Sequence, residues 1–275
     1  AIICMVLAYI SIALMGVFVK YASDELPSSE ILFSRFLIGF IFLLPFMIRD
    51  GDFKVELSQW PFLVMRNLAG IASMLLTFYA IKYLPISIAV LLMNTSALFV
   101  PLLLFVLRTR TPLKVLACSF LGFAGVSIIM LTDSSKHFEL QHIGYALGAA
   151  FLAAMAFISL QELNKHNSPK NIVFYFHLLG SLLLPLFFVT QWTIPSAQGF
   201  VLLLLVGGFG LVFQLLLTRA FKYAPANVIT PFAFTGVIFS SICDWLFWHN
   251  VPTLNFWIGS LVIIVSVSLL AKIRR

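Results

Sequence analysis

Charged side chains are scarce in this sequence. Only 10% of the 275 residues are Asp, Glu, Lys or Arg, whereas a soluble domain has about 25%. Hydrophobic residues make up 61% of the chain and the mean hydropathy is +1.07, and no polar stretch is long enough to fold as a soluble domain. This composition excludes a soluble globular protein and predicts a chain that crosses a membrane several times.

The motifs of enzymes and metal sites are also missing. Cys4, Cys118 and Cys243 each stand alone in an apolar run, without the paired spacing of a metal or redox site. HExxH, GxSxG and P-loop patterns do not occur. The stretch "GGFG" at 207–210 has no Lys-Ser/Thr pair after it, so we interpret its glycines as allowing close helix packing or lining a cavity. We therefore expect no catalysis, no cofactor and no bound metal.

Long apolar runs are what the sequence does contain. Each is long enough to cross a hydrocarbon core about 30 Å thick, and short polar or proline-bearing loops separate them. They predict an all-α integral membrane protein with ten transmembrane helices. The predicted spans are about 2–20, 30–48, 61–83, 86–107, 112–132, 142–163, 171–190, 199–221, 226–248 and 254–271.

Lys and Arg are distributed unevenly between the two ends of these helices. With ten spans both termini share one side, and 12 Lys and Arg residues fall there, against Lys20, Lys82 and Lys136 on the other side. Because basic loops stay on the cytoplasmic side, we expect both termini in the cytoplasm. The net charge of +7 then reflects these loops. No basic run with interleaved aromatics is present, so we expect no nucleic-acid partner.

One short sequence motif occurs twice in the chain. "AIKYLP" at 80–85 returns as "AFKYAP" at 220–225, and the same shift of 140 residues relates Thr95 to Thr235. We interpret this as one five-helix unit used twice. Because five is odd, the second copy is inverted in the membrane, which is the symmetry of carriers that work by alternating access. The two repeats are predicted to cover residues 1–133 and 142–275.

These features resemble a known family. The two "KY.P" joints, the ten helices in two groups of five and the second helix "SSEILFSRFLIGFIFLLPF" are similar to the drug/metabolite transporter superfamily, EamA family. The resemblance covers essentially the whole chain. It implies secondary transport of small organic metabolites across the cytoplasmic (inner) membrane by a multi-pass protein.

Small polar residues near the middle of the helices are the candidates for substrate contact. Asn94, Thr95 and Ser96 lie about ten residues from the start of their helix, or about 15 Å deep, and Thr235 occupies the matching place in the second repeat. We expect the substrate to bind between these two helices. Hydrogen bonding between helices is the alternative role. Further candidates for the cavity wall are Gln214, Tyr9, Tyr79 and Tyr175.

Ionisable residues inside the spans are candidates for gating or for lining a vestibule. Arg35, Arg66, His177 and Asp244 lie nearer the helix ends, and Glu162 ends the sixth helix. Each Arg could instead anchor at lipid headgroups by extending its side chain to the interface. Arg35 and Asp244 could pair, and a shift of 142 relates Arg35 to His177.

The sequence therefore predicts a secondary transporter for a small organic metabolite, an amino-acid-like or other amphiphilic solute. We expect it to act as a monomer or weak homodimer in the lipid bilayer. No Asp or Glu lies at the midplane, which argues against an inorganic cation as substrate. A membrane-embedded enzyme acting on lipid-linked substrates is one alternative, although the five His residues are scattered. A channel is the other.

The inverted repeat predicts opposite positions for two lysines in nearly identical local sequence. In a cysteine-free background, Lys82→Cys should react with an impermeant maleimide in whole cells, and Lys222→Cys should react only after the membrane is opened. Labelling of both positions from the same side would reject the inverted arrangement.

Overall fold

The computed structural model describes residues 1–106, 113–132, 139–188, 193–223 and 230–273. Every regular element in these ranges is a helix. The elements are α1 (Ile2–Ala22), α2 (Ser28–Asp50), η1 (Leu57–Gln59), α3 (Trp60–Tyr83), α4 (Ile86–Asn94), α5 (Ser96–Val106), α6 (Leu113–Thr132), α7 (Leu140–His166), α8 (Pro169–Phe188), α9 (Ala197–Tyr223), η3 (Thr230–Phe234), α11 (Thr235–Trp248) and α12 (Leu254–Ile273).

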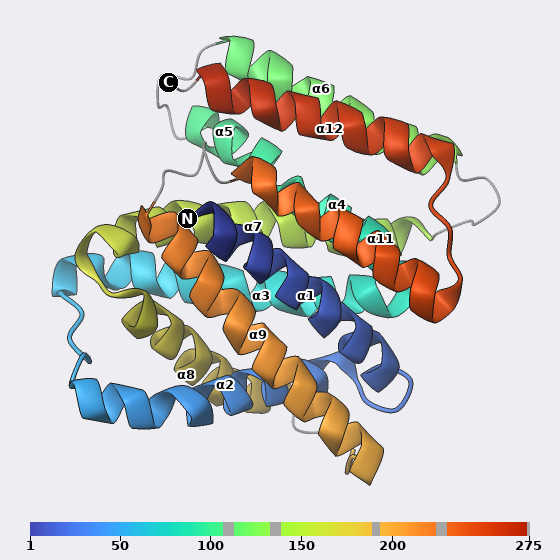
Figure 1. The fold of residues 1–275 in the computed structure, drawn as a ribbon. Helices are drawn as coiled ribbons and strands as arrows, with labels where there is room; N and C mark the ends of the chain where they lie inside the picture. Colours follow the sequence, from blue (N-terminus) through green and yellow to red (C-terminus); the bar gives the residue numbers. More distant parts are fainter. Residues whose placement is uncertain (107–112, 133–138, 189–192, 224–229, 274–275) are drawn as a thin grey trace.

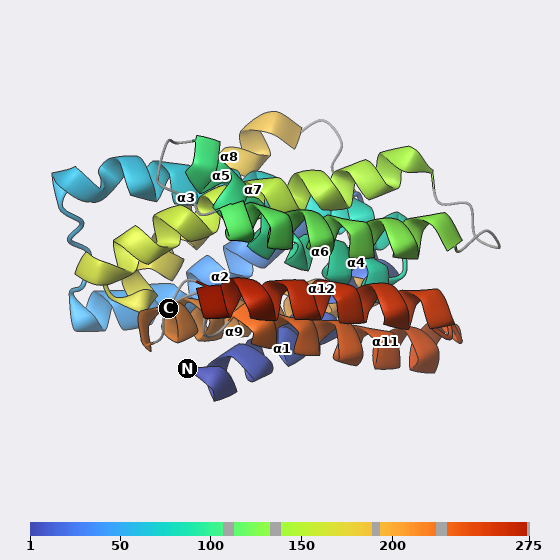
Figure 2. The same ribbon diagram turned by 90° about the horizontal axis from the view of Figure 1, so that it is seen from above.

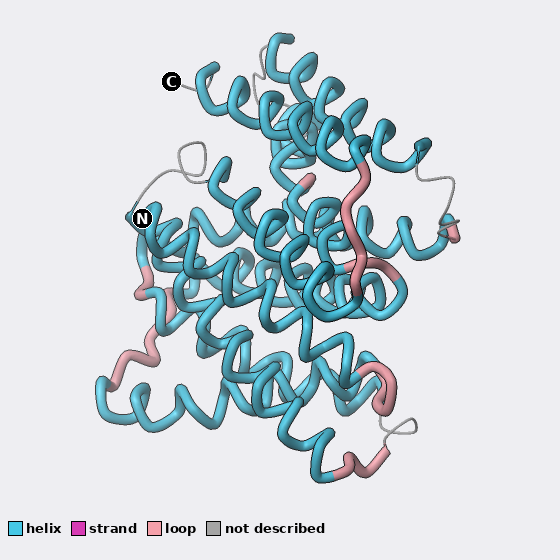
Figure 3. The backbone as a smooth tube through the Cα atoms, turned by 45° about the vertical axis from the view of Figure 1, so that its right-hand side comes forward, coloured by secondary structure: helices cyan, strands magenta, loops and turns pink. Residues whose placement is uncertain are grey.

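The helices form one bundle with their axes roughly aligned (Figures 1 and 2). Both termini lie toward the same end of the bundle, here called the terminal end, and the described loops lie at the ends of the helices (Figure 3). Among the described residues, α1, α2, α7, α9 and the segment Leu57–Tyr83 are each long and apolar enough to cross a membrane by themselves.

The predicted spans agree with the observed helices to within a few residues at most ends. Two spans are each made of two pieces. The predicted helix 86–107 is α4 followed by α5, and the helix predicted at 226–248 includes η3 and α11. These two composite helices are called helix four and helix nine below. The ten-helix prediction is thereby confirmed.

Helices of the first half pack on helices of the second half (Figures 1 and 2). α1 lies along α9 and α3 lies along α7, while α2 lies along α8 and α6 along α12. In the predicted repeat, α7 corresponds to α1 and α9 to α3, so the first two pairs would be one contact made twice. Two five-helix units related by a two-fold axis would pair in this way.

Reciprocal contacts between α2 and α8 refine the alignment of the repeats. A Cβ at Gly39 would collide with the ring of His177, and a Cβ at Gly180 would collide with the ring of Phe36. A shift of 141 residues relates Gly39 to Gly180 and Phe36 to His177. Under this shift each of the two glycine–ring contacts is the repeat counterpart of the other. With this shift the counterpart of Arg35 would be Phe176, next to His177, to which the shift of 142 relates it.

The "GGFG" stretch in α9 brings that helix against α2. A Cβ at Gly207 would lie 2.5 Å from the Ile38 side chain, and one at Gly210 would lie 2.5 Å from Arg35 Nε. A Cβ at Gly208 would meet nothing within 4 Å. Gly207 therefore allows close approach of α9 to α2, as the sequence predicted, and Gly210 leaves room for the Arg35 side chain.

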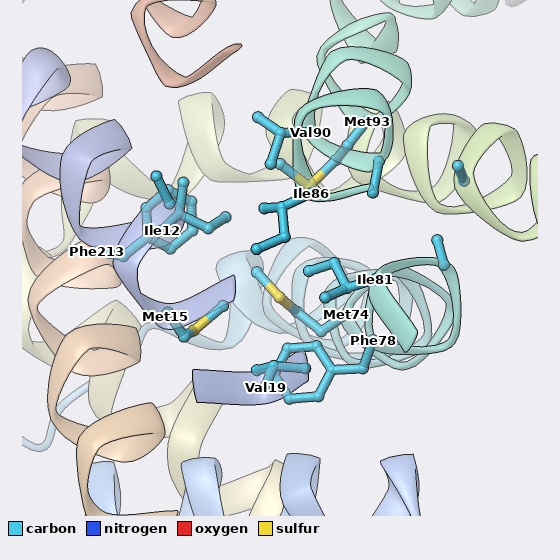
Figure 4. Close-up of a cluster of buried hydrophobic side chains, with 14 of the residues drawn as sticks. Ile12, Met15, Val19, Met74, Phe78, Ile81, Ile86, Val90, Met93 and Phe213 are labelled. Atoms are coloured by element: carbon cyan, nitrogen blue, oxygen red, sulfur yellow. The ribbon is translucent and has the colours of Figure 1, made fainter. Parts of the chain in front are cut away.

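A tightly packed apolar cluster fills the bundle between α1, α3 and α4. Figure 4 shows these side chains interlocking between the three helices, with Phe213 of α9 beside them. The labelled side chains are all at most 7% exposed, so this cluster is part of the protein core. The labelled members are Ile12, Met15, Val19, Met74, Phe78, Ile81, Ile86, Val90, Met93 and Phe213.

Neighbouring glycines in α9 provide a matched test of the close packing. Gly207→Ala should lower the melting temperature of the purified protein, because the added methyl group overpacks the contact with Ile38 at a cost of about 1–3 kcal/mol. Gly208→Ala adds the same group where space is open and should not lower it. Equal melting temperatures of the two variants would contradict the packing described here.

Candidate functional site

Helix four and helix nine both change their winding at a threonine. α4 ends at Asn94 and α5 begins at Ser96, with Thr95 between them, while η3 gives way to α11 at Thr235. The hydroxyl of Thr95 donates to the Leu92 carbonyl at 2.6 Å. The hydroxyl of Thr235 likewise donates to a carbonyl three residues earlier, at 2.7 Å. Such bonds compete with regular helix bonding, which explains why the two changes fall at repeat-related positions.

The two interruptions are joined by a side chain. Asn94 Nδ2 donates to the carbonyl of Ala233 in η3 at 3.1 Å, and Asn94 is buried. A Cβ at Gly236, next to the interruption in helix nine, would lie 2.5 Å from the ring of Tyr9. Helix four, helix nine and α1 thus meet near the middle of the bundle.

A narrow cavity adjoins this meeting point. The centre of a water molecule can reach about 30 Å³ of it. It has room for water but not for a metabolite without some opening of the helices. The lining residues are Tyr9, Arg66, Gly70, Ser73, Met74, Met93, Asn94, Ser96, Ala153, Ala156, Phe157, Phe176, Phe213, Gln214 and Leu217.

Some of the residues proposed from the sequence come together here. Tyr9, Asn94, Ser96 and Gln214 line the cavity, and so does Arg66, which was expected in a vestibule. The hydroxyl groups of Thr95 and Thr235 instead bond to their own helices.

Two of the three tyrosines lie away from the cavity walls. Tyr79 packs against Tyr145, with ring centroids 5.6 Å apart. The hydroxyl of Tyr175 donates to the Phe53 carbonyl at 2.7 Å, in the loop between α2 and α3. Tyr175 therefore holds a loop at the terminal end rather than facing the cavity.

Most of the cavity wall was not predicted from the sequence. Phe157, Phe176 and Phe213 supply aromatic surface, and Ala153 and Ala156 leave the space open on the α7 side. In the sequence these residues look like any other apolar residue of a spanning helix. A partial signal existed in Ser73, a central polar residue that donates to the Ala149 carbonyl at 2.8 Å.

The two arginines within the spans are buried in the protein. Arg66 is 3% exposed and its Nη2 donates to Gln214 Oε1 at 3.1 Å, with its Cζ 4.3 Å from the ring centre of Phe176. Arg35 is 0% exposed, with Nη2 3.5 Å from the Gly210 carbonyl and Cζ 5.2 Å from the Phe36 ring. Neither side chain reaches a lipid headgroup, so the anchoring alternative does not apply in this structure.

His177 lies behind the cavity wall. Its Nδ1 is 2.9 Å from the Val173 carbonyl, and its ring packs edge-to-face on Phe36 and on Phe176. The Phe36 and Phe176 rings are themselves 4.9 Å apart. Arg35, Arg66 and His177 therefore surround one pair of phenylalanines at the contact between α2 and α8.

The acidic candidates lie at opposite ends of the bundle. Asp244 accepts hydrogen bonds from the backbone amides of Ile86 and Ser87, at 3.0 and 2.7 Å, and so caps the start of α4. These amides occupy both carboxylate oxygens, and the pairing of Asp244 with Arg35 suggested by the sequence is not formed. Glu162 bonds to Lys165 at 2.6 Å at the terminal end.

Glu162 also lines an open surface pocket at the terminal end, separate from the cavity described above. The pocket is formed by α7 and α9, the two helices that contribute Phe157 and Gln214 to the cavity. Phe157 stacks on Phe221 of the pocket wall, with ring centroids 5.4 Å apart. This aromatic pair lies between the pocket and the cavity. The pocket is lined by Ile158, Gln161, Glu162, Lys165, Phe221, Lys222 and Tyr223.

No group of three or more His, Cys, Asp or Glu that could hold a metal ion is found in the described part of the chain. The cavity wall itself contains no Asp or Glu. Its polar groups are hydroxyls, amides and one guanidinium, which suit hydrogen bonding to an organic solute better than coordination of a metal.

Known proteins match this chain along its whole length. The chain is 30% identical over 274 residues to the pseudopaline exporter CntI of Pseudomonas aeruginosa (strain UCBPP-PA14), covering 98% of this chain and 95% of the relative. It is 26% identical to the riboflavin transporter of Vibrio cholerae serotype O1 (98% and 91% covered). It is also 26% identical to the S-adenosylmethionine uptake transporter of Rickettsia prowazekii (94% and 87% covered).

The fold is also found in a crystal structure. That protein is 15% identical and matches with a TM-score of 0.66, covering 97% of this chain and 95% of its own. The model of the EamA-like transporter family matches residues 1–131 and 141–272. The chain therefore belongs to the EamA-like transporter family and is a multi-pass inner-membrane transporter rather than an enzyme.

Proposed function

We propose that this transporter carries a small organic metabolite by alternating access, through a site between helix four and helix nine. The relatives named above are described as transporters of pseudopaline, riboflavin and S-adenosylmethionine. Exporters and uptake systems both occur among them, so the relatives support an organic solute in general and no particular direction.

The facing interruptions of helix four and helix nine carry this proposal. Non-helical backbone deep in a membrane is tolerated where it is buried in protein or lines a cavity. Interrupted helices at the interface of two repeats are a common place for substrate binding in carriers. Here Thr95 and Thr235 mark the two interruptions, and Asn94 of the cavity wall joins them. We assign substrate contact to Asn94, Ser96, Tyr9, Gln214 and Arg66.

The two halves that would alternate are residues 1–133 and 142–275, with both termini in the cytoplasm. The crossed pairing of α1 with α9 and of α3 with α7 supports this division. So do the reciprocal contacts of Gly39 and Gly180. The excess of Lys and Arg at the terminal end supports the orientation.

We assign a closure to each side of the cavity. On the side away from the termini, Asp244 of helix nine holds the first amides of helix four. On the terminal side, the Phe157–Phe221 stack separates the cavity from the surface pocket. The residue related to Asp244 by the 140-residue shift is Leu104, so the carboxylate closure belongs to one side only. Opening either closure alone would expose the cavity to one side of the membrane.

Counterflow in proteoliposomes tests transport. Candidate metabolites that raise the melting temperature of the purified protein are loaded inside, and uptake of the same labelled compound is followed. A carrier gives saturable uptake that is accelerated by internal substrate. A channel, the remaining alternative, gives flux that neither saturates nor shows acceleration. Such unsaturable flux would reject the carrier mechanism.

Asn94 is the most specific test of the site. Asn94→Leu should weaken binding of such a metabolite by about 1–3 kcal/mol, because a polar group of the bound solute is left unpaired. Asn164→Leu is the control. Asn164 of α7 is also buried and donates to the Thr218 carbonyl of α9, but it does not line the cavity. It should lower the melting temperature without changing the affinity. If Asn94→Leu behaved like this control, Asn94 would be a link between helices only.

The Asp244 closure predicts a change in access. Asp244→Ala should destabilise the protein by about 0.5–2 kcal/mol, the usual cost of losing a helix cap. It should also speed the reaction of Ser87→Cys with an impermeant maleimide in a cysteine-free background. Glu25→Ala is the control, because Glu25 accepts from the Ser196 amide at the same end of the bundle but away from helix four. Equal labelling rates in the two variants would show that Asp244 does not restrict access to the start of helix four.

A further inference from the structure

Two positive charges lie inside the bundle without a carboxylate. Arg35 and Arg66 are both fully or nearly fully buried, and neither forms a salt bridge with any described residue. Their guanidinium groups lie over two rings, Phe36 and Phe176, whose centroids are 4.9 Å apart. Charged residues within a membrane protein are costly and are usually paired, so an unpaired group is a sign of function.

The buried acids of the described residues are engaged elsewhere. Glu30 accepts hydrogen bonds from the amide and the hydroxyl of Thr193, both at 3.0 Å. Asp244 accepts from two amides at the start of α4. Both carboxylates therefore stabilise ends of the bundle, and neither neutralises the arginines.

The surroundings of Arg66 form a prepared site. The Phe176 ring lies under its guanidinium group and Gln214 fixes Nη2, while Nε is buried with no hydrogen-bond partner. Gly70 is one turn further along α3, and a Cβ there would collide with Nη1. The chain thus makes room for the guanidinium group beside the cavity and leaves part of its donor capacity unused.

Arg35 lies behind this site, on the far side of the Phe36–Phe176 pair. Its Nε and Nη1 are buried and without hydrogen-bond partners, and its single weak bond is to the Gly210 carbonyl at 3.5 Å. It does not line the cavity. Its charge nevertheless acts at the same place, because screening by water is weak in the interior. The site therefore has a positive potential greater than that of Arg66 alone.

We propose that the cavity binds an organic carboxylate, with the carboxylate group at Arg66 and the apolar body along Phe157, Phe213 and Met74. The planar guanidinium group matches a carboxylate, and a charge-assisted bond would replace the missing counter-ion. This inference rests on the proposed function and names the substrate class of the same site. One lining arginine and no lining acid favour a compound of net negative charge over a zwitterion or a cation.

Ligand-induced shifts in melting temperature test the charge preference directly. The probes are sets of arylalkyl compounds that share one apolar body, such as 3-phenylpropionate, its amide and the corresponding amine, with aliphatic and indole sets beside them. We expect the carboxylate of at least one set to bind about 10- to 100-fold more tightly than its amide, as expected for a hydrogen bond to a charged group. The amine should not bind. If no acid bound better than its amide, or if phosphate esters bound and carboxylates did not, the proposal would be wrong.

Arg66→Gln tests the assigned residue, with the exposed Arg219→Gln as the matched control. Arg66→Gln should abolish the preference for acid over amide, while Arg219→Gln should keep it. Arg66→Lys retains the charge and should retain part of the preference. Without ligand, Arg66→Gln should melt at the same or a higher temperature, because it removes a buried unpaired charge. A lower melting temperature with the acid preference intact would make Arg66 a structural residue and overturn the assignment.

These measurements are independent of transport. Carboxylate binding that depends on Arg66 in a protein without counterflow would reject the proposed function and leave the anion site standing. Counterflow of an uncharged or cationic solute that depends on Asn94, with no acid preference, would keep the transporter mechanism and reject the anion site.

Discussion

A hydrocarbon interior offers no hydrogen-bond partner to the polypeptide backbone, and much of this structure follows from that constraint. Between the ends of each helix, the backbone N–H and C=O groups bond to one another within the helix. Where helix four changes its winding, the Thr95 hydroxyl and the Asn94 amide bond to carbonyls, and the latter bond crosses to η3. Where helix four begins, Asp244 accepts from its first two amides. Polar side chains are thus placed where the backbone cannot complete its own bonding, and these are also the places that border the cavity or its closure.

Close approach of helices depends on glycine rather than on apolar attraction, because lipid is as apolar as the side chains that face it. Gly39 and Gly180 bring α2 and α8 into reciprocal contact, and Gly207 brings α9 onto α2. Gly70 and Gly210 instead leave room beside the arginines. The same residue type therefore serves packing at some positions and the polar site at others, and only the neighbouring side chain distinguishes the two.

Charges divide according to depth. The buried acids Glu30 and Asp244 bind backbone and hydroxyl groups near the ends of the bundle, while Arg35 and Arg66 lie within α2 and α3, about two turns from the start of each helix. The aromatic rings of Phe36 and Phe176 separate and support the two guanidinium groups. An apolar cavity with one guanidinium in its wall can discriminate by charge as well as by shape, since a mismatched solute would leave a polar group unpaired.

The sequence by itself determined the ten helices, the family and the internal repeat, because apolar length and the recurrence of "KY.P" are visible without any contact. It also pointed to Asn94, Ser96 and Gln214, since a polar residue deep in a span must face protein or water, and it predicted a vestibule position for Arg66. It could not separate Tyr9, which lines the cavity, from Tyr175, which holds a loop. Nor could it select Phe157, Phe176 and Phe213 from the 29 phenylalanines. The tertiary structure decided those choices, because lipid and protein interior are equally apolar, and only the packing of α7, α8 and α9 fixes which face of each helix meets the cavity.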